Sequence, residues 1–385
     1  MIQPGSDAWI GVLGGGQLGR MLALAARPIG YKILTWTGGD RSGAAEVADE
    51  IMHQPFDDRQ ALEKFCSQVD VATAEFENLP GEMLKQVEER VPLRPNSHSI
   101  ITSQHREREK KFLSDNGFGC ARHFIITDLD ELKNGVKEIG RDCILKTAEF
   151  GYDGKGQQKI SGDATAEDLA TIWQSFDSQR AVLEERVELD TEISVLVARG
   201  AAGDVVTYDP AENIHRNHIL DVSIVPARLP ENISEEARKV TVGVADALDY
   251  VGILAVEFFI SKAGRLLVNE IAPRPHNSGH HTIDGCMTSQ FQQQARAICG
   301  LPLGSTALKK PCAMLNLLGD IWADENTPPD WTPIFDTPGA TLHLYGKAGA
   351  RAGRKMGHAN FLADDLETVL AQVARCRQAY GMPPI

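Results

Sequence analysis

The sequence predicts an α/β protein with an N-terminal doubly wound parallel sheet, a central unit and a small C-terminal β-rich segment. Over the first hundred residues, short apolar runs alternate with helical patterns, and such strand–helix–strand alternation is typical of parallel sheets. From about residue 120, the expected strands are separated by glycine-rich turns. After residue 301, two further strands precede a helix. These three successive patterns indicate the three parts.

The N-terminal unit is expected over residues 1–104. Its first strand is a short run of apolar residues and one glycine, as in buried parallel strands, and a glycine turn follows it. The expected elements are strand 9–13, helix 17–26, strand 31–35, helix 59–68, strand 69–74 and, leading into the next unit, a hydrophilic helix at 104–113.

The central unit is expected over 105–300 and the C-terminal segment over 301–385. Two apolar strands of the central unit are joined by the four-residue loop 261–264, which is a hairpin signal. The expected elements are helices 163–175 and 235–248, strands 251–260 and 265–271, strands 313–317 and 341–345, and helix 364–377.

Composition places the chain among ordinary globular proteins. Its 385 residues are 42% hydrophobic, and no apolar run approaches the ~20 residues of a membrane helix. The formal charge of −14 disfavours a nucleic-acid partner. The N-terminal residues lack the pattern of a secretory signal, and the seven scattered cysteines are expected to be reduced thiols. We therefore expect a cytoplasmic protein with neither a nucleic-acid nor a membrane partner.

A glycine loop follows the first strand. Gly14–Gly19 has the form G-x-G-x-x-G between a strand and a helix, where backbone amides and a helix N-terminus accept an anion. A nicotinamide dinucleotide would need an acidic residue at the end of the second strand, but Thr35–Thr37 lies there. Three interpretations stay open: an anion of another substrate, a tight turn without ligand, and a nicotinamide cofactor.

A strand lysine and a second glycine loop predict a nucleotide site. Lys146 ends the strand Cys143–Lys146, and the loop Gly151–Gln157 follows it. Such a loop lets the backbone cover nucleotide phosphates while the lysine reaches their oxygens. The stretch is not a Walker P-loop, because Glu149 and Gly156 depart from that pattern. A glycine-rich hairpin without ligand is the alternative.

Two carboxylates on the central hairpin predict a Mg²⁺ site. With Ile260 opposite Arg265, Glu257 faces Val268 and lies diagonally across from Glu270 on the same face, ~7 Å away. Carboxylate oxygens suit Mg²⁺, and unpaired acids in apolar strands would be costly to bury. Two solvated acids on an exposed sheet face are the alternative.

A cationic loop follows this hairpin. The stretch 272–281 contains Arg274 and three histidines, and it lies where a phosphorylated or anionic co-substrate would be held. His276, His280 and His281 lack the spacing of a zinc site. A later basic cluster is expected to bind a phosphate or to be a solvated loop; it comprises Lys347, Arg351, Arg354 and Lys355.

Together these motifs resemble the ATP-grasp ligases, and more narrowly the N5-carboxyaminoimidazole ribonucleotide synthases of purine biosynthesis. The resemblance spans about 9–360 and is carried by Gly14–Met21, Glu75–Asn78, Phe150–Gly154 and Ala272–Thr282. It implies a central ATP-grasp domain with a mobile glycine-loop lid at about 120–187, and a homodimer.

The resemblance also implies roles for individual residues. ATP would be bound by Arg106, Lys146, Gly151, Tyr152, Asp153, Gly154, Lys155, Gly156, Gln157, Glu184, Glu185, Arg186, Val187, Glu192, His215, Asn269 and Glu270. The acceptor ribonucleotide and bicarbonate would contact Gln17, Leu18, Glu75, Tyr152, Asp153, Arg274, His276, Asn277, Ser278, Lys347, Arg354 and Lys355. Two Mg²⁺ ions would be held by Glu257 and Glu270. Catalytic roles would belong to Lys146, Arg274, Lys347 and Asp153, the last as base or orienter of the amine.

One metal ligand departs from the usual ATP-grasp pattern. Many such ligases have an asparagine two residues after the second glutamate, where this chain has Ala272. Asn269 would have to compensate, and because strand alternation points it to the opposite face, a bulge would be required.

The implied reaction converts ATP, bicarbonate and 5-aminoimidazole ribonucleotide into the N5-carboxylated ribonucleotide, ADP and phosphate. Bicarbonate is too poor an electrophile for an amine until it is phosphorylated to carboxyphosphate, and the lid would protect that intermediate from water. Two alternatives stay open: a formate-using glycinamide ribonucleotide transformylase, and an oxidoreductase that uses the loop 14–19.

Overall fold

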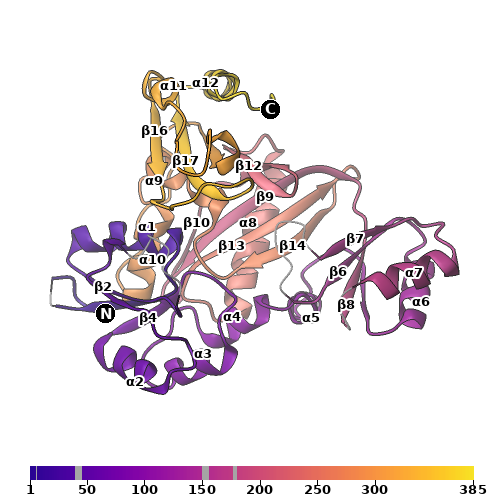
Figure 1. Ribbon diagram of the computed structural model, residues 1–385, viewed down its shortest axis with the longest axis horizontal. Helices are drawn as coiled ribbons and strands as arrows, with labels where there is room; N and C mark the ends of the chain where they lie inside the picture. Colours follow the sequence, from indigo (N-terminus) through magenta and orange to yellow (C-terminus); the bar gives the residue numbers. More distant parts are fainter. Residues whose placement is uncertain (6, 40–45, 150–155, 177–179) are drawn as a thin grey trace.

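The structure is a computed structural model, which describes residues 1–5, 7–39, 46–149, 156–176 and 180–385. Within this part of the chain, three sheets organise the fold (Figure 1). A small N-terminal sheet and a small sheet from the central unit lie on opposite sides of one long sheet in this view. No helix of the described residues has the length and apolar character needed to cross a membrane.

The N-terminal sheet is parallel, with the strand order β3-β2-β1-β4, and both faces are covered. Ile10 and Val12 pack with Leu22 on one face, while Trp36 packs with Phe65 on the other. The predicted doubly wound sheet is therefore confirmed. Its elements are β1 (Trp9–Leu13), α1 (Gln17–Ala26), η1 (Arg27–Ile29), β2 (Lys32–Trp36), β3 (Glu50–Met52), α2 (Arg59–Gln68), β4 (Val71–Ala74), α3 (Gly81–Glu88) and α4 (Ser97–Ser103).

The second sheet is antiparallel, with the order β5-β8-β6-β7, and it is packed against two helices through Leu132, Leu145 and Leu169. It follows α5 (Arg106–Asp115) and comprises β5 (His123–Ile126), α6 (Leu129–Ile139), β6 (Cys143–Thr147), β7 (Gln157–Ile160), α7 (Ala166–Ser175) and β8 (Ala181–Glu185).

The long sheet joins the central and C-terminal segments. Its order is β14-β13-β9-β11-β12-β15-β17-β16, with β10 paired to β9, so the C-terminal strands extend the central sheet through the β12–β15 pair. The strands are β9 (Leu189–Arg199), β10 (Val205–Thr207), β11 (Ala211–Arg216), β12 (Ile219–Val225), β13 (Gly252–Ser261), β14 (Leu266–Ala272), β15 (Cys312–Leu318), β16 (Ala340–Leu344) and β17 (Lys355–Leu362). The helices are α8 (Glu231–Ala247), η3 (Asn277–Gly279), α9 (Thr282–Gly285), α10 (Gln290–Cys299), η4 (Gly319–Ile321), α11 (Thr332–Phe335) and α12 (Leu366–Ala379).

The predicted register of the β13–β14 hairpin was wrong. Ile260 pairs with Leu266, because the turn holds one residue more than expected and Gly264 adopts φ +75° within it. A bulge then places Asn269 outside the ladder, so that Glu257 lies directly opposite Glu270 instead of diagonally across from it. The two carboxylates still share one face of the sheet.

Candidate active site

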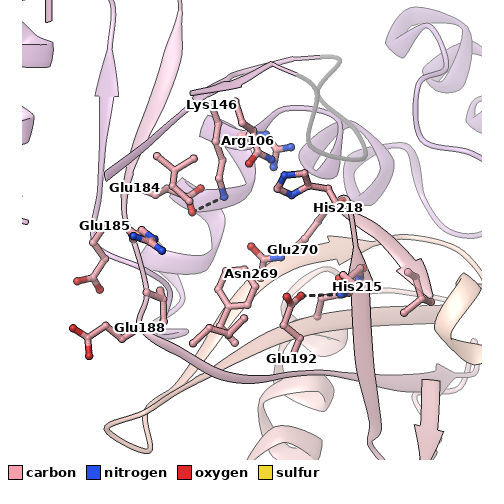
Figure 2. A pocket seen from close by; sticks show the side chains of 18 of the residues that line it. Arg106, Lys146, Glu184, Glu185, Glu188, Glu192, His215, His218, Asn269 and Glu270 are labelled. Atoms are coloured by element: carbon pink, nitrogen blue, oxygen red, sulfur yellow. Dashed lines mark hydrogen bonds and ion pairs between the residues drawn. The ribbon is translucent and has the colours of Figure 1, made fainter. Parts of the chain in front are cut away.

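A cavity of about 920 Å³ lies between the small antiparallel sheet and the β9–β14 part of the long sheet. Figure 2 shows side chains from both sheets converging on it. The predicted site residues that line it are Arg106, Lys146, Gln157, Glu184, Glu185, Arg186, Val187, Glu192, His215, Glu257, Asn269, Glu270, Arg274, His276, Asn277 and Lys355. Segments that are far apart in the sequence therefore meet in one site.

A buried cluster of charges forms the wall next to β6 and β8. Lys146 Nζ donates to Glu184 Oε2 at 2.8 Å, and Lys110 Nζ of α5 lies 3.6 Å from Glu184 Oε1. Burial opposes ionisation of Glu184, but the two lysines hold its pKa to about 2. Burial lowers the pKa of Lys146; Glu184 opposes this shift, and the neighbouring cations add to it. Two cations and one carboxylate leave a net positive charge at this wall, which suits phosphate oxygens.

The opposite wall contains a paired acid and histidine. Glu192 Oε2 of β9 lies 3.1 Å from His215 Nδ1 of β11 (Figure 2). Burial opposes protonation of His215, yet its contact with Glu192 raises its pKa above the ordinary value. Nearer β8, Glu185 and Arg186 already donate their N–H groups to the carbonyls of Arg122 and Asp142. The amides of Glu185 and Arg186 are thus used inside the protein.

The two hairpin carboxylates lie between these walls. Glu257 Oε1 is 3.0 Å from His276 Nε2; burial opposes ionisation of Glu257, but its contact with His276 lowers its pKa. Burial and the charge of Glu257 raise the pKa of Glu270. Burial and the charge of Glu270 likewise raise the pKa of Glu109 on α5 to about 8. This crowding of acids is what a divalent cation would relieve.

The metal prediction rests on two carboxylates and the bulged Asn269. No group of three acidic, histidine or cysteine side chains that could hold a metal occurs in the part of the chain that the structure describes. Asn269 lines the cavity next to Glu270, and its carbonyl accepts a hydrogen bond from Lys110 at 3.1 Å. The bulge required for Asn269 is therefore present, and the oxygen donors fit Mg²⁺.

Arg274 is fixed by an acid that the sequence interpretation missed. Its Nε and Nη2 atoms donate to the two carboxylate oxygens of Glu77, at 2.6 and 3.1 Å. Burial opposes ionisation of Glu77, but Arg274 holds its pKa to about 2. Gln104 in turn donates to the Glu77 carbonyl at 2.7 Å. The N-terminal unit thus orients a predicted substrate residue of the central unit, and the quoted motif Glu75–Asn78 already contained this acid.

The loop after β14 is held from beneath by α10. Gln290 donates to the His276 carbonyl and accepts from the His276 N–H, both at 2.8 Å. Asn277 is buried, and its side-chain nitrogen has no hydrogen-bond partner within the described residues. A buried donor without a partner at a cavity wall is costly unless a ligand satisfies it.

The first glycine loop already binds an anion, which is part of the protein. The Glu75 carboxylate accepts hydrogen bonds from the N–H of Gly16 and, at 2.7 Å, of Gly19. A Cβ at Gly14 would lie 2.3 Å from the Glu75 side chain, which explains the glycines. The amides expected for a substrate anion are therefore used internally. Leu18 is buried in the apolar core beside this loop.

Only part of the predicted basic cluster lines the cavity. Lys355 lines the cavity, whereas Lys347 Nζ donates to the Lys355 carbonyl at 3.1 Å. Arg354 Nη1 donates to the carbonyls of Ala348 and, at 2.7 Å, Gly349. Arg354 thus braces the loop that carries Lys347, instead of lining the cavity.

The second glycine loop is described only at its end. Gly151, Tyr152, Asp153, Gly154 and Lys155 lie outside the described residues. Gly156 has φ +70°, and a Cβ there would lie 2.5 Å from the Thr147 hydroxyl.

Three family descriptions match successive parts of the chain. They are the ribonucleotide synthetase preATP-grasp domain at 8–104, the ATP-grasp domain at 111–291 and the phosphoribosylaminoimidazole carboxylase C-terminal domain at 312–372. The N5-carboxyaminoimidazole ribonucleotide synthase of Bacillus subtilis is 42% identical over 362 residues, with 94% of this chain and 93% of the relative covered. The chain belongs to the N5-carboxyaminoimidazole ribonucleotide synthase family of ATP-grasp ligases.

Solved structures of this family agree with the fold. An ADP complex of an N5-carboxyaminoimidazole ribonucleotide synthetase has a TM-score of 0.90 and 39% identity, covering 99% of this chain and 98% of the other. The Aspergillus clavatus enzyme in complex with ADP and 5-aminoimidazole ribonucleotide has a TM-score of 0.85 and 28% identity, covering 97% and 99%. The predicted ATP-grasp architecture is confirmed, and the family is the one that the motifs indicated.

Proposed function

We propose that this chain carboxylates 5-aminoimidazole ribonucleotide with bicarbonate, using ATP and releasing ADP, in the cavity between the two sheets. The observation that carries the proposal is the convergence there of the cationic wall at Lys146, the opposed acids Glu257 and Glu270, and the Arg274 loop. These are the groups that a phosphoryl transfer followed by acceptor attack needs.

ATP would lie along the cavity between β6–β8 and β9–β11. Its phosphates would face Lys146 and Arg106, which line the cavity, and buried Lys110 beside Glu184 would add positive charge to this wall. Its ribose would face Glu192, whose contact with His215 fixes the carboxylate. Its base would lie against residues 184–187.

Mg²⁺ would be held by Glu257 and Glu270, with Asn269 beside them. The metal supplies neutralisation of phosphate charge during transfer to an oxygen nucleophile. The protein's own part is to hold both carboxylates on one face of the hairpin and to aim Lys146 at the same space.

The acceptor would bind where Arg274, His276, Asn277 and Lys355 line the cavity. Arg274 is aligned by Glu77, and the side-chain nitrogen of Asn277 is a donor without a partner in the described residues. Transfer of the γ-phosphoryl group to bicarbonate gives carboxyphosphate, and attack of the acceptor amine on its carbonyl carbon then releases phosphate. Because carboxyphosphate hydrolyses readily, the amine has to be in place first. Tyr152 and Asp153, which lie outside the described residues, would contact the acceptor, with Asp153 as base or orienter of the amine.

Further assignments belong to the same proposal. Gln17, Glu75 and Ser278 would border the acceptor, and a second Mg²⁺ would share the carboxylates. Unit boundaries would lie near 104 and 300, and the enzyme would act as a cytoplasmic homodimer.

The proposal is tested by measuring ADP release while each substrate is omitted in turn. Release should require ATP, bicarbonate and 5-aminoimidazole ribonucleotide together, because the amine has to be in place before bicarbonate is phosphorylated. Turnover with formate and glycinamide ribonucleotide instead would show that the sister transformylase reaction is the correct one.

Replacing Arg354 by alanine is expected to raise the KM for the ribonucleotide roughly thirtyfold, which is about 2 kcal/mol, while the KM for ATP stays nearly unchanged. Arg354 braces the loop of Lys347 beside cavity-lining Lys355, and the ATP wall lies on other elements. Steady-state kinetics with each substrate varied separately measures the split. An equal loss for both substrates, or no loss, would remove the C-terminal loop from acceptor binding.

A further inference from the structure

A line of buried polar side chains crosses the long sheet behind His276. Ser194 on β9 is paired with Glu257 on β13, and Asn213 on β11 is paired with Ser223 on β12. The registers place all four on one face of the sheet. Ser194 and Ser223 are fully buried, and Asn213 is 5% exposed. Hydroxyl and amide groups are costly to bury unless each finds a partner.

The partners form one continuous chain of hydrogen bonds. Ser223 Oγ donates to Asn213 Oδ1 at 2.8 Å, and Asn213 Nδ2 donates to Ser194 Oγ at 2.9 Å. Ser194 Oγ donates to Ser278 Oγ at 2.7 Å. Ser278 Oγ lies 2.8 Å from His276 Nδ1. The chain therefore runs from the interior of the sheet to the histidine that contacts Glu257.

The direction of donation follows from the orientation of the Asn213 amide, which accepts from Ser223 through Oδ1 and donates to Ser194 through Nδ2. A hydroxyl has one proton, so Ser194 donates to Ser278, and Ser278 keeps its own proton for His276 Nδ1. The Ser278 backbone N–H independently points at the same Nδ1 atom, at 3.4 Å. Two donors aimed at one ring nitrogen leave it without a proton.

We infer that Ser194, Asn213 and Ser223 are positioning residues that hold His276 in the tautomer with Nδ1 as acceptor and the proton on Nε2. That proton is donated to Glu257 Oε1, 3.0 Å away. One carboxylate oxygen is thereby fixed, and the other is left for the cavity. The tautomer follows from the geometry alone, whereas its effect on turnover rests on the proposed function.

The tautomer is read directly by NMR of protein labelled with ¹⁵N-histidine, at about pH 8, where ordinary histidines are neutral. The His276 signals are identified by their loss in His276→Asn. The expected result for the parent is a protonated Nε2 and a bare Nδ1. A proton on Nδ1, or on both nitrogens, overturns the inference.

Asn213→Asp is nearly isosteric and is expected to reverse the direction of the hydrogen bonds. A carboxylate only accepts, so Ser194 would turn to donate to it, Ser278 would donate to Ser194, and the His276 proton would move to Nδ1. Because a buried charge can prevent folding, Ser194→Ala is the second variant; it removes the donor to Ser278, and His276 should populate both tautomers. If every folded variant of this pair keeps the parent tautomer unchanged, the relay does not set it.

The same variants separate a positioning role from a structural one. Ser194→Ala should lower kcat about tenfold with little change in the KM for ATP, as is typical of outer residues that orient a ligand-holding side chain. Ser234→Ala is the control: it removes a buried hydroxyl on α8, outside the hydrogen-bond chain, and should leave kcat within twofold of the parent. Equal losses in both variants would contradict the relay. An absence of carboxylation in the parent would instead overturn the proposed function, and the NMR result would still decide the tautomer.

Discussion

Replacing Glu270 by glutamine is expected to lower kcat at least about a hundredfold, or ~3 kcal/mol, while leaving the fold intact. Glu270 lies directly opposite Glu257, and burial together with that neighbouring charge raises its pKa. Glutamine keeps the shape of the side chain but removes the charge that would face Mg²⁺. Because the substitution also removes a like-charge repulsion, the thermal midpoint of the metal-free protein should not fall.

The measurement is kcat at saturating ATP, ribonucleotide and Mg²⁺, with circular dichroism and thermal melting as checks of folding. Glu188→Gln is the matched control, since Glu188 also lines the cavity but is exposed and lies outside the hairpin. The control should stay within twofold of the parent. A Glu270→Gln enzyme within a factor of a few of the parent would show that this carboxylate holds no essential metal.

Apolar patterning predicted the bounds of several local elements well but the register of the β13–β14 hairpin wrongly. The bounds of α1 and α2 coincide with the prediction, because each shows a helical apolar period next to clear turn residues. Strands β11 and β12 were not delimited, since Asn213 and Ser223 interrupt their apolar character. These polar groups are satisfied across strands by partners distant in the sequence, which a local pattern does not reveal.

The segments around Lys146, Glu192, Glu257 and Arg274 line one cavity, but the groups that hold them did not show in the sequence. Lys110 belongs to a hydrophilic helix that suggests a solvated face, yet it is 1% exposed and lies beside Glu184. Charge density alone does not say which face of a helix is covered. Glu75 illustrates the converse: the G-x-G-x-x-G loop does bind a carboxylate, but the carboxylate comes from the chain itself.

Replacing Glu77 by glutamine is expected to raise the KM for the ribonucleotide at least about a hundredfold and to lower the free energy of unfolding by about 3 kcal/mol. Glu77 accepts both hydrogen bonds of the Arg274 fork, and glutamine would leave that guanidinium without its counter-charge. The lower end of the range for a buried pair applies, because 19% and 26% of the two side chains stay exposed. The KM for ATP should change little, since the Lys146 wall contains neither residue.

The pH dependence of the unfolding free energy provides an independent check on the Glu77–Arg274 pair. The pKa of Glu77 is about 2 in the folded protein, against an ordinary value of 4.5, so the ion pair stabilises the fold above pH 4.5 and its contribution disappears as the pH falls towards 2. The difference in unfolding free energy between parent and Glu77→Gln should therefore be largest near neutrality and shrink through this window. Lys310→Gln, which removes the exposed Lys310–Asp364 pair, should show almost no difference at neutral pH. If Glu77→Gln matched that control in both stability and KM, the fork would be a surface contact, and Arg274 would owe its position to the loop alone.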